Sequence, residues 1–215
     1  MVGTSCLRLS GIARMAGEML AIDVPPTYPD RETETVWLRT RIAPLDVLED
    51  GRLMARAAGV RLRLAVVDDL GGVAGLYVPG LVVLGLADCA RIADQIWSTR
   101  VRAPTALDRV LTPSRLITRP HLVRAVRRRI LAHELGHAMV AQGCDWTPCE
   151  DEELSADYLA GRISAALAWS LDLGQVIFEV VGCSGHGCTH PEPAFRAHAY
   201  ATGYSEQLMS QHIAA

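Results

Sequence analysis

The chain lacks lysine altogether, since all 21 of its basic residues are arginine. We attribute this to codon usage in a GC-rich genome and not to a function. The formal net charge of −3 argues against nucleic acid as the main partner. Long apolar runs are missing as well. No window of about 18 uncharged apolar residues occurs, so a membrane-spanning helix is not expected.

The N-terminus also lacks the pattern of a secretory signal, because Arg8, Arg14 and Glu18 interrupt it and leave no clean apolar region. A reducing cytoplasm is therefore the expected compartment. Of the 215 residues, 50% are hydrophobic and 21% are charged. This hydrophobic content is enough to form a sizeable core. We expect a main domain over residues 44–215, preceded by a helical extension and linker over residues 1–43.

Hydrophobic periodicity and turn residues predict a mixed α+β domain. Helices are expected over residues 1–22, 44–58, 120–142, 151–169 and from about residue 191 onward. Strands are expected over residues 60–68, 73–78 and 81–86, with a turn at Pro79-Gly80 between the last two. A proline-rich loop is expected over residues 24–35, and a connecting segment over residues 99–120.

The most informative pattern is His-Glu-Leu-Gly-His at residues 133–137, inside the expected helix 120–142. His133 and His137 are four residues apart, so a helix presents both imidazoles on one face. Two neutral nitrogens at that spacing can share one tetrahedral zinc. Glu134 projects about 100° away from His133, near enough to reach a metal-bound water without being a ligand. Gly136 leaves room for another backbone or a substrate.

The next expected helix supplies a third ligand. Glu153 and Asp157 are four residues apart and share a face of an otherwise apolar helix. Glu153 is the candidate ligand, and Asp157 would accept a hydrogen bond from the outer nitrogen of a ligand histidine. We interpret the neighbouring acidic residues, Glu150, Asp151 and Glu152, as helix caps.

With these residues the chain resembles the gluzincin metallopeptidases, and among them most closely the CAAX-prenyl-endopeptidase and HtpX-like family. Residues 74–86 resemble the strand hairpin of that family, and His190-Pro191 with Arg196 matches its HP-x4-R signature. The resemblance covers roughly residues 44–205. It implies a zincin-like α+β domain, in which a small sheet has an edge strand over the HExxH helix and a glutamate helix follows. It also implies one catalytic Zn²⁺ and a protein or peptide as substrate.

Under this resemblance Glu134 is the general base of peptide hydrolysis, and His190 is the first candidate to stabilise the oxyanion. Tyr158 and Tyr200 are the other candidates for that role. The edge strand would bind an extended peptide through four residues: Ala74, Gly75, Leu76 and Tyr77. Arg196 is expected to pair with an acidic residue.

The chain departs from this family in lacking membrane helices, in lacking an asparagine near position 73, and in the 15 residues that separate His137 from Glu153. A second resemblance is to the ImmA-like regulatory peptidases. It leaves an alternative function open: a zinc-binding regulatory protein that acts on one specific partner or is catalytically silent. The sequence does not indicate the oligomeric state.

Four of the six cysteines form two similarly spaced pairs, Cys144 with Cys149 and Cys183 with Cys188. They could hold a second, structural zinc, form disulfides, or be free thiols, and His186 could replace one thiolate. Cys6 and Cys89 are expected to be ordinary thiols.

An arginine cluster precedes the histidine motif and spreads around most of its helix. Arg124 and Arg128 are expected to be solvated on the face opposite the histidines. The cluster forms no single stripe, so it does not indicate nucleic-acid binding.

Overall fold

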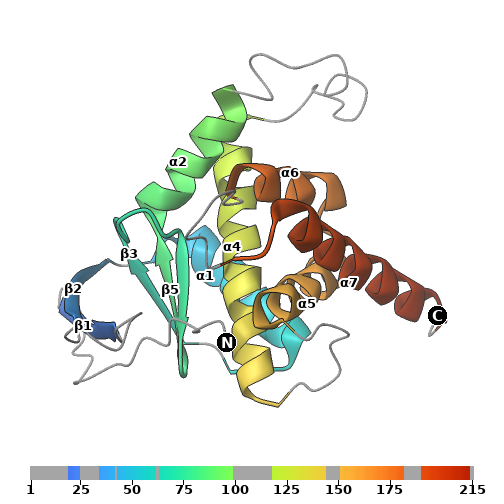
Figure 1. The fold of residues 1–215 in the computed structure, drawn as a ribbon, viewed down its shortest axis with the longest axis horizontal. Coiled ribbons are helices and arrows are strands. Elements are labelled where there is room, and N and C mark those ends of the chain that lie inside the picture. The colour runs from blue at the N-terminus through green and yellow to red at the C-terminus, as the bar shows by residue number, and fades with distance from the viewer. Residues whose placement is uncertain are drawn as a thin grey trace.

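The structure, a computed structural model, describes residues 19–24, 34–41, 43–61, 63–98, 118–143, 151–181 and 190–213. These residues form a mixed α+β fold in which helices predominate. Figure 1 shows a small sheet on one side of helix α4 (Arg119–Ala141) and helices α5 (Glu152–Ala166), α6 (Leu171–Val181) and α7 (Pro193–Ile213) on the other. Helix α4 therefore lies in the middle of the molecule.

The described residues form one sheet of five strands in the order β1-β2-β3-β5-β4. Their bounds are β1 (Met19–Val24), β2 (Glu34–Arg41), β3 (Leu64–Val67), β4 (Gly75–Val78) and β5 (Leu81–Gly85). β3 and β5 run parallel, whereas the other neighbouring pairs are antiparallel. The turn between β4 and β5 contains Gly80 at φ 82°, a left-handed conformation that suits glycine. Among the described strands, β4 lies at the edge of the sheet.

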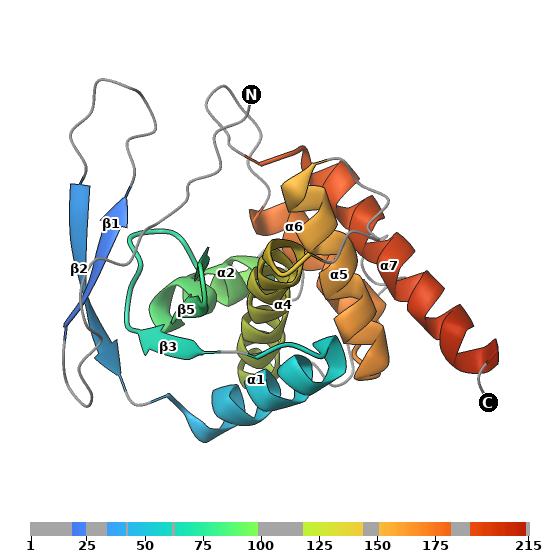
Figure 2. The same cartoon turned by 90° about the horizontal axis from the view of Figure 1, so that it is seen from below.

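Two further helices lie among the described residues. Helix α1 (Leu45–Ala58) runs between β2 and β3, and helix α2 (Leu86–Ile96) follows β5 directly. Both pack against α4, which Figure 2 shows almost end-on between the sheet and the C-terminal helices. Because neighbours surround α4, its segment from Arg129 to Met139 is buried on all sides.

The starts of the two central helices follow from their sequences. Pro120 lies in the first turn of α4, where its missing N–H costs no hydrogen bond, and the Thr118 hydroxyl accepts from the His121 backbone N–H. Asp151 caps α5, and its Oδ1 accepts from the backbone N–H groups of Glu153 and Leu154. The predicted capping role of Asp151 is thus confirmed, and it fixes where Glu153 lies on α5.

Helices α5 and α7 cross at two facing glycines. A Cβ added at Gly161 would overlap the carbonyl oxygen of Tyr200, and one at Gly203 would overlap that of Tyr158. The two backbones can approach closely only because both side chains are missing. This close crossing brings α7, with Arg196, against the face of α5 that carries Asp157.

The structure changes several expectations drawn from the sequence. Residues 19–22 are part of β1 and not of a helix, and residues 34 and 35 begin β2 and do not belong to a loop. Both segments contain β-branched residues, Ile22 and Val24 in β1 and Thr35, Val36 and Thr40 in β2, and such residues favour strands. β2 also pairs with β3, so the N-terminal segment contributes to the main sheet. The sequence interpretation missed helices α2 and α6. Within the described ranges, no helix is both long and apolar enough to span a membrane.

Candidate metal centre

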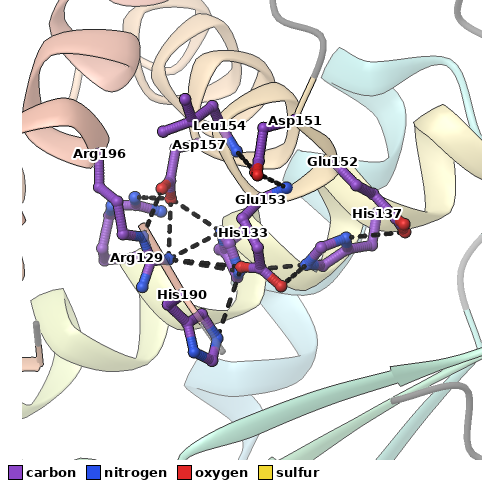
Figure 3. A network of polar contacts seen from close by, with 10 residues as sticks. All are labelled: Arg129, His133, His137, Asp151, Glu152, Glu153, Leu154, Asp157, His190 and Arg196. Carbon is purple, nitrogen blue, oxygen red and sulfur yellow. Dashed lines mark hydrogen bonds and ion pairs between the residues drawn. The ribbon is translucent and has the colours of Figure 1, made fainter. Parts of the chain in front are cut away.

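Three predicted ligands come together between α4 and α5 (Figure 3). The Nε2 atoms of His133 and His137 are 3.2 Å apart. Glu153 reaches both, with Oε2 3.2 Å from Nε2 of His133 and Oε1 3.5 Å from Nε2 of His137. Both histidines are buried, and Glu153 is partly buried. The group therefore has the composition and the closeness of a metal site.

Gly136 explains how α5 comes so near to the two histidines. A Cβ at this position would lie 2.5 Å from the carbonyl oxygen of Ala156 and 2.7 Å from its Cα. The space that the sequence predicts at Gly136 is thus filled by the backbone of α5. Because this crossing lies next to His137, it sets the distance between the histidines and Glu153.

We expect Gly136→Ala to separate the two helices and to weaken both the fold and the metal centre. The atoms that the new methyl group would meet belong to backbone, so a side-chain movement cannot relieve the overlap. Such overpacking costs about 1–3 kcal/mol of unfolding free energy. Denaturant unfolding and Zn²⁺ titration of the variant check this result. Gly59→Ala is a useful contrast, because no atom lies within 4 Å of a Cβ there and only backbone strain at φ 68° remains.

The arrangement fits a small tetrahedral ion such as Zn²⁺. Ligand bonds of about 2.0–2.1 Å require neighbouring ligand atoms to be about 3.3–3.4 Å apart in a tetrahedron. The 3.2 Å between the two histidine Nε2 atoms lies close to that value, and each oxygen of Glu153 lies at a similar distance from one histidine, Oε2 3.2 Å from His133 and Oε1 3.5 Å from His137. In addition, Glu153 Oε2 is buried and accepts no hydrogen bond from the described residues. A bound cation would satisfy this oxygen.

Asp157 lies behind His133, as predicted. Its Oδ1 is 2.8 Å from His133 Nδ1, which leaves the opposite nitrogen, Nε2, facing the metal group. Two guanidinium groups hold the same carboxylate: Arg129 Nη2 is 2.6 Å from Oδ1, and Arg196 Nε is 2.6 Å from Oδ2. Asp157 is completely buried, and both arginines are nearly so. The predicted pairing of Arg196 with an acidic residue is therefore confirmed.

Aromatic rings surround these cations. The guanidinium carbon of Arg129 lies 4.0 Å from the ring centre of Phe178 and 4.5 Å from that of Tyr200. Sequence reasoning missed Arg129 as part of the site, although it is one helical turn before His133 and so shares its face. The four-residue spacing between Arg129 and His133 was the feature of the sequence that could have identified this arginine.

The network shifts the pKa values of its members. Burial alone would lower the pKa of His133, but Asp157 and Glu153 outweigh it and raise that pKa to about 9. Burial would likewise raise the pKa of Asp157, yet the charges of His133 and Arg129 hold it well below its usual range. The pKa of Glu153 is also lowered, because contacts with His133 and His137 outweigh its burial. Both carboxylates are thus charged at neutral pH, as metal binding requires, and a metal bound to His133 would displace the proton that the raised pKa of this ring retains.

Glu134 occupies the other side of His133, against the edge strand. It is 7% exposed, and this burial raises the pKa of its carboxyl group despite the neighbouring histidines. A Cβ at Gly75 would come within 2.8 Å of Glu134 Oε1 and would also collide with Ile130. The absence of a side chain at position 75 therefore gives Glu134 room between α4 and β4.

The predicted peptide-binding residues lie along β4 and just before it. Ala74 and Gly75 are buried, whereas Leu76 and Tyr77 are partly buried. The ring of Tyr77 stacks on that of His137, with ring centres 6.5 Å apart and planes at 13°. β4 thus runs beside the metal group. The ring of Tyr77 lies against His137 of α4, and the backbone of Gly75 faces Ile130 and Glu134 of the same helix.

The three candidate oxyanion donors differ in position. His190 belongs to the site, since its Nε2 is 3.5 Å from Glu153 Oε2 and its side chain is 42% exposed. The Tyr158 hydroxyl donates to Glu206 at 2.5 Å on the far part of α7. Tyr200 is buried beside Arg129 and Phe178. Of the three, only His190 keeps a position suited to contact with a substrate.

The arginine cluster before the motif is paired with acidic side chains of the same chain. Arg124 and Arg128 each donate two hydrogen bonds to Asp50 of α1, and Arg127 lies 3.6 Å from Asp46. The expectation that Arg124 and Arg128 are simply solvated is therefore wrong, because α1 packs beside α4 and supplies a carboxylate. These arginines therefore connect α4 to α1.

Of the cysteines, Cys89 is a buried free thiol, as expected, and its burial raises its pKa to about 12. The clustered cysteines at positions 144, 149, 183 and 188, together with Cys6 and His186, lie outside the described residues. Their three alternative states therefore stay predictions.

Comparison with models of protein families, with curated proteins and with solved structures finds no match to this chain. The function of the protein is therefore inferred from the site itself.

Proposed function

We propose that the protein is a zinc-dependent metallopeptidase with a zincin-like domain, which hydrolyses peptide bonds in protein or peptide substrates. The observation that carries the proposal is the group of His133, His137 and Glu153, with the buried carboxylate of Glu134 beside it. Three protein ligands leave a fourth position open, as is typical of catalytic zinc sites and not of structural ones. The edge strand next to this group supports a peptide as the substrate.

In this proposal the residues of the chain have separate tasks. His133, His137 and Glu153 would hold the zinc, whose chemistry is to activate a water and to polarise a carbonyl group. Glu134 accepts a proton from the attacking water and returns it to the leaving amine. The raised pKa of Glu134 suits this role, because a carboxyl group of very low pKa would be a poor acceptor of the proton.

The remaining groups bind and orient the substrate. An extended peptide would add to the edge of β4 that pairs with no other described strand, through backbone hydrogen bonds that give affinity with little sequence preference. His190, half-exposed and next to Glu153, would donate a hydrogen bond to the developing oxyanion. Burial lowers the pKa of His190, which favours the neutral ring with a single N–H donor.

Metal removal tests the proposal. Dialysis against a chelator is expected to reduce hydrolysis of a generic quenched-fluorescence peptide by at least about 100-fold, and one equivalent of Zn²⁺ should restore it. Circular dichroism of the metal-free protein shows whether the fold survives. Full activity after complete removal of the metal would contradict the proposal.

The same assay separates the proposed function from the alternative. A protein that binds one Zn²⁺ per chain but hydrolyses no generic peptide or casein would favour a regulatory protein that acts on one partner. Hydrolysis of several unrelated peptides would favour a general peptidase.

A further inference from the structure

The outer ring nitrogen of His137 has a carboxylate neighbour that is not part of the metal group. Nε2 of His137 faces His133 and Glu153, so Nδ1 points away from the metal position. Figure 3 shows the carboxylate of Glu152 on this side, with Oε1 3.5 Å from Nδ1. An acceptor at the outer nitrogen keeps the proton there and leaves the other nitrogen free to bind metal.

We propose that Glu152 is a positioning residue of the metal centre, which orients His137 through a 3.5 Å contact, longer than the 2.8 Å hydrogen bond by which Asp157 holds His133. The inference rests on the proposed function, because it concerns the same metal centre. It also revises the interpretation of Glu152 as a helix cap only.

The geometry of α5 explains how one short segment serves both histidines. Along a helix, Glu152 points about 100° to one side of Glu153, and Asp157 about 40° to the other side. Glu153 therefore lies between two carboxylates and contacts both Nε2 atoms. The other two carboxylates lie at the outer nitrogens, Asp157 2.8 Å from Nδ1 of His133 and Glu152 3.5 Å from Nδ1 of His137.

The capping of α5 does not account for the Glu152 side chain. Asp151 Oδ1 already accepts from the first free backbone N–H groups, those of Glu153 and Leu154, at 2.9 and 3.1 Å. An acidic residue in the first turn also gains from the helix dipole, but that gain does not depend on where its carboxylate points. The position beside His137 Nδ1 is therefore a separate feature.

Tyr77 restricts His137 from another direction, by stacking on its ring. A stacking contact limits the tilt of the ring, but it does not distinguish one ring nitrogen from the other. A carboxylate does distinguish them, because it favours the nitrogen that carries the proton. Tyr77 and Glu152 thus complement each other, and Glu152 supplies the choice of tautomer.

Substitutions at Glu152 can test this role without unfolding the protein, since its side chain is 44% exposed and that of Asp157 is completely buried. We expect Glu152→Ala to raise the Zn²⁺ dissociation constant about 10-fold, the lower end of the range for such supporting residues. Glu152→Gln keeps an oxygen acceptor and should lose less. Competition with a chromophoric chelator measures both constants.

Co²⁺ substitution provides a readout that a loss of helix stability would not move. The visible absorption bands of bound Co²⁺ depend on ligand geometry, so we expect them to change in Glu152→Ala and to return toward the original in Glu152→Gln. Thermal unfolding of the metal-free variants measures the helix contribution separately. Glu49→Ala, which removes an exposed carboxylate from α1, is the control for net charge.

An unchanged Zn²⁺ affinity and an unchanged Co²⁺ spectrum in Glu152→Ala would overturn the proposal. So would a loss of affinity that Glu49→Ala reproduces, because it would reflect charge alone. If the unmodified protein bound no Zn²⁺, the metal centre itself would be rejected, and Glu152 would lose its role with it. The failure of this inference and the failure of the proposed function are thus distinguishable.

Discussion

Glu134→Gln is expected to reduce peptide hydrolysis by about 10³-fold and to leave one Zn²⁺ bound per chain. Glutamine has the shape of glutamate but cannot accept the proton of the attacking water. The three candidate ligands are His133, His137 and Glu153, so the substitution removes none of them. Steady-state kinetics with a quenched-fluorescence peptide, together with metal analysis, measure the two effects separately.

The fold should tolerate this change. Burial raises the pKa of Glu134 above its ordinary value, so the charged form of its carboxyl group lowers the stability of the folded state. A neutral amide removes that cost, and we expect an unfolding temperature equal to or above that of the unmodified protein. Glu49→Gln makes the same chemical change on the exposed face of α1 and should alter neither rate nor metal content. Hydrolysis at the unmodified rate in Glu134→Gln would reject Glu134 as the base.

The metal group could be predicted from the sequence because helix geometry alone determines most of it. Two histidines four residues apart share a face in any helix, and Glu153 and Asp157 repeat that spacing on the next helix. The structure brings His133, His137 and Glu153 together and places Asp157 on His133 Nδ1. The identity of the metal and the peptidase activity are still predictions.

Contacts between distant segments could not be predicted in this way. Asp50 is 74 residues from Arg124 in the sequence, and nothing in the local pattern shows that α1 and α4 pack side by side. The burial of Arg129 depends on Phe178 of α6 and Tyr200 of α7, which pack around it only in the folded chain. The sequence therefore predicted the three candidate ligands, but it did not identify Arg129, which holds Asp157 behind them.

The missed helices have a different explanation. The segment that forms α6, Leu171–Val181, carries polar residues at positions 172, 175 and 179, and this spacing of three and four residues is typical of a helix. Helix α2 carries a helical spacing as well, in its buried residues Cys89, Ala93 and Ile96. That spacing was a usable signal immediately after β5.

Asp157→Asn is expected to weaken both the fold and the metal centre. Asparagine keeps the shape of the side chain but removes the charge that compensates two buried guanidinium groups, those of Arg129 and Arg196. Loss of one partner of a buried ion pair costs about 3–5 kcal/mol of unfolding free energy. Loss of the acceptor charge behind His133 should also weaken Zn²⁺ binding about 10-fold to 100-fold. Chemical denaturation of the metal-free protein and Zn²⁺ titration measure these effects.

The molecule offers a matched control in Asp50, a second buried aspartate that is held by two arginines. Its partners, Arg124 and Arg128, have side chains that are 38% and 27% exposed, whereas the partners of Asp157 are 4% and 6% exposed. After Asp50→Asn the two arginines can turn toward water, so we expect a smaller loss of stability and an unchanged Zn²⁺ affinity. Equal effects of the two substitutions on Zn²⁺ affinity would contradict a special role of Asp157.

The pH dependence of stability should change in a defined direction. The pKa of Asp157 is lowered in the folded protein, so its contribution to stability is present above its ordinary pKa of 3.8 and is lost as the pH falls below that value. Asp157→Asn removes a titrating group whose folded-state pKa is low. The difference in unfolding free energy between the two proteins should therefore be largest near neutral pH and should shrink as the pH falls below about 4. A constant difference from pH 7 to pH 3 would show that the charge of Asp157 does not stabilise the fold, and that the buried arginines are compensated by other groups.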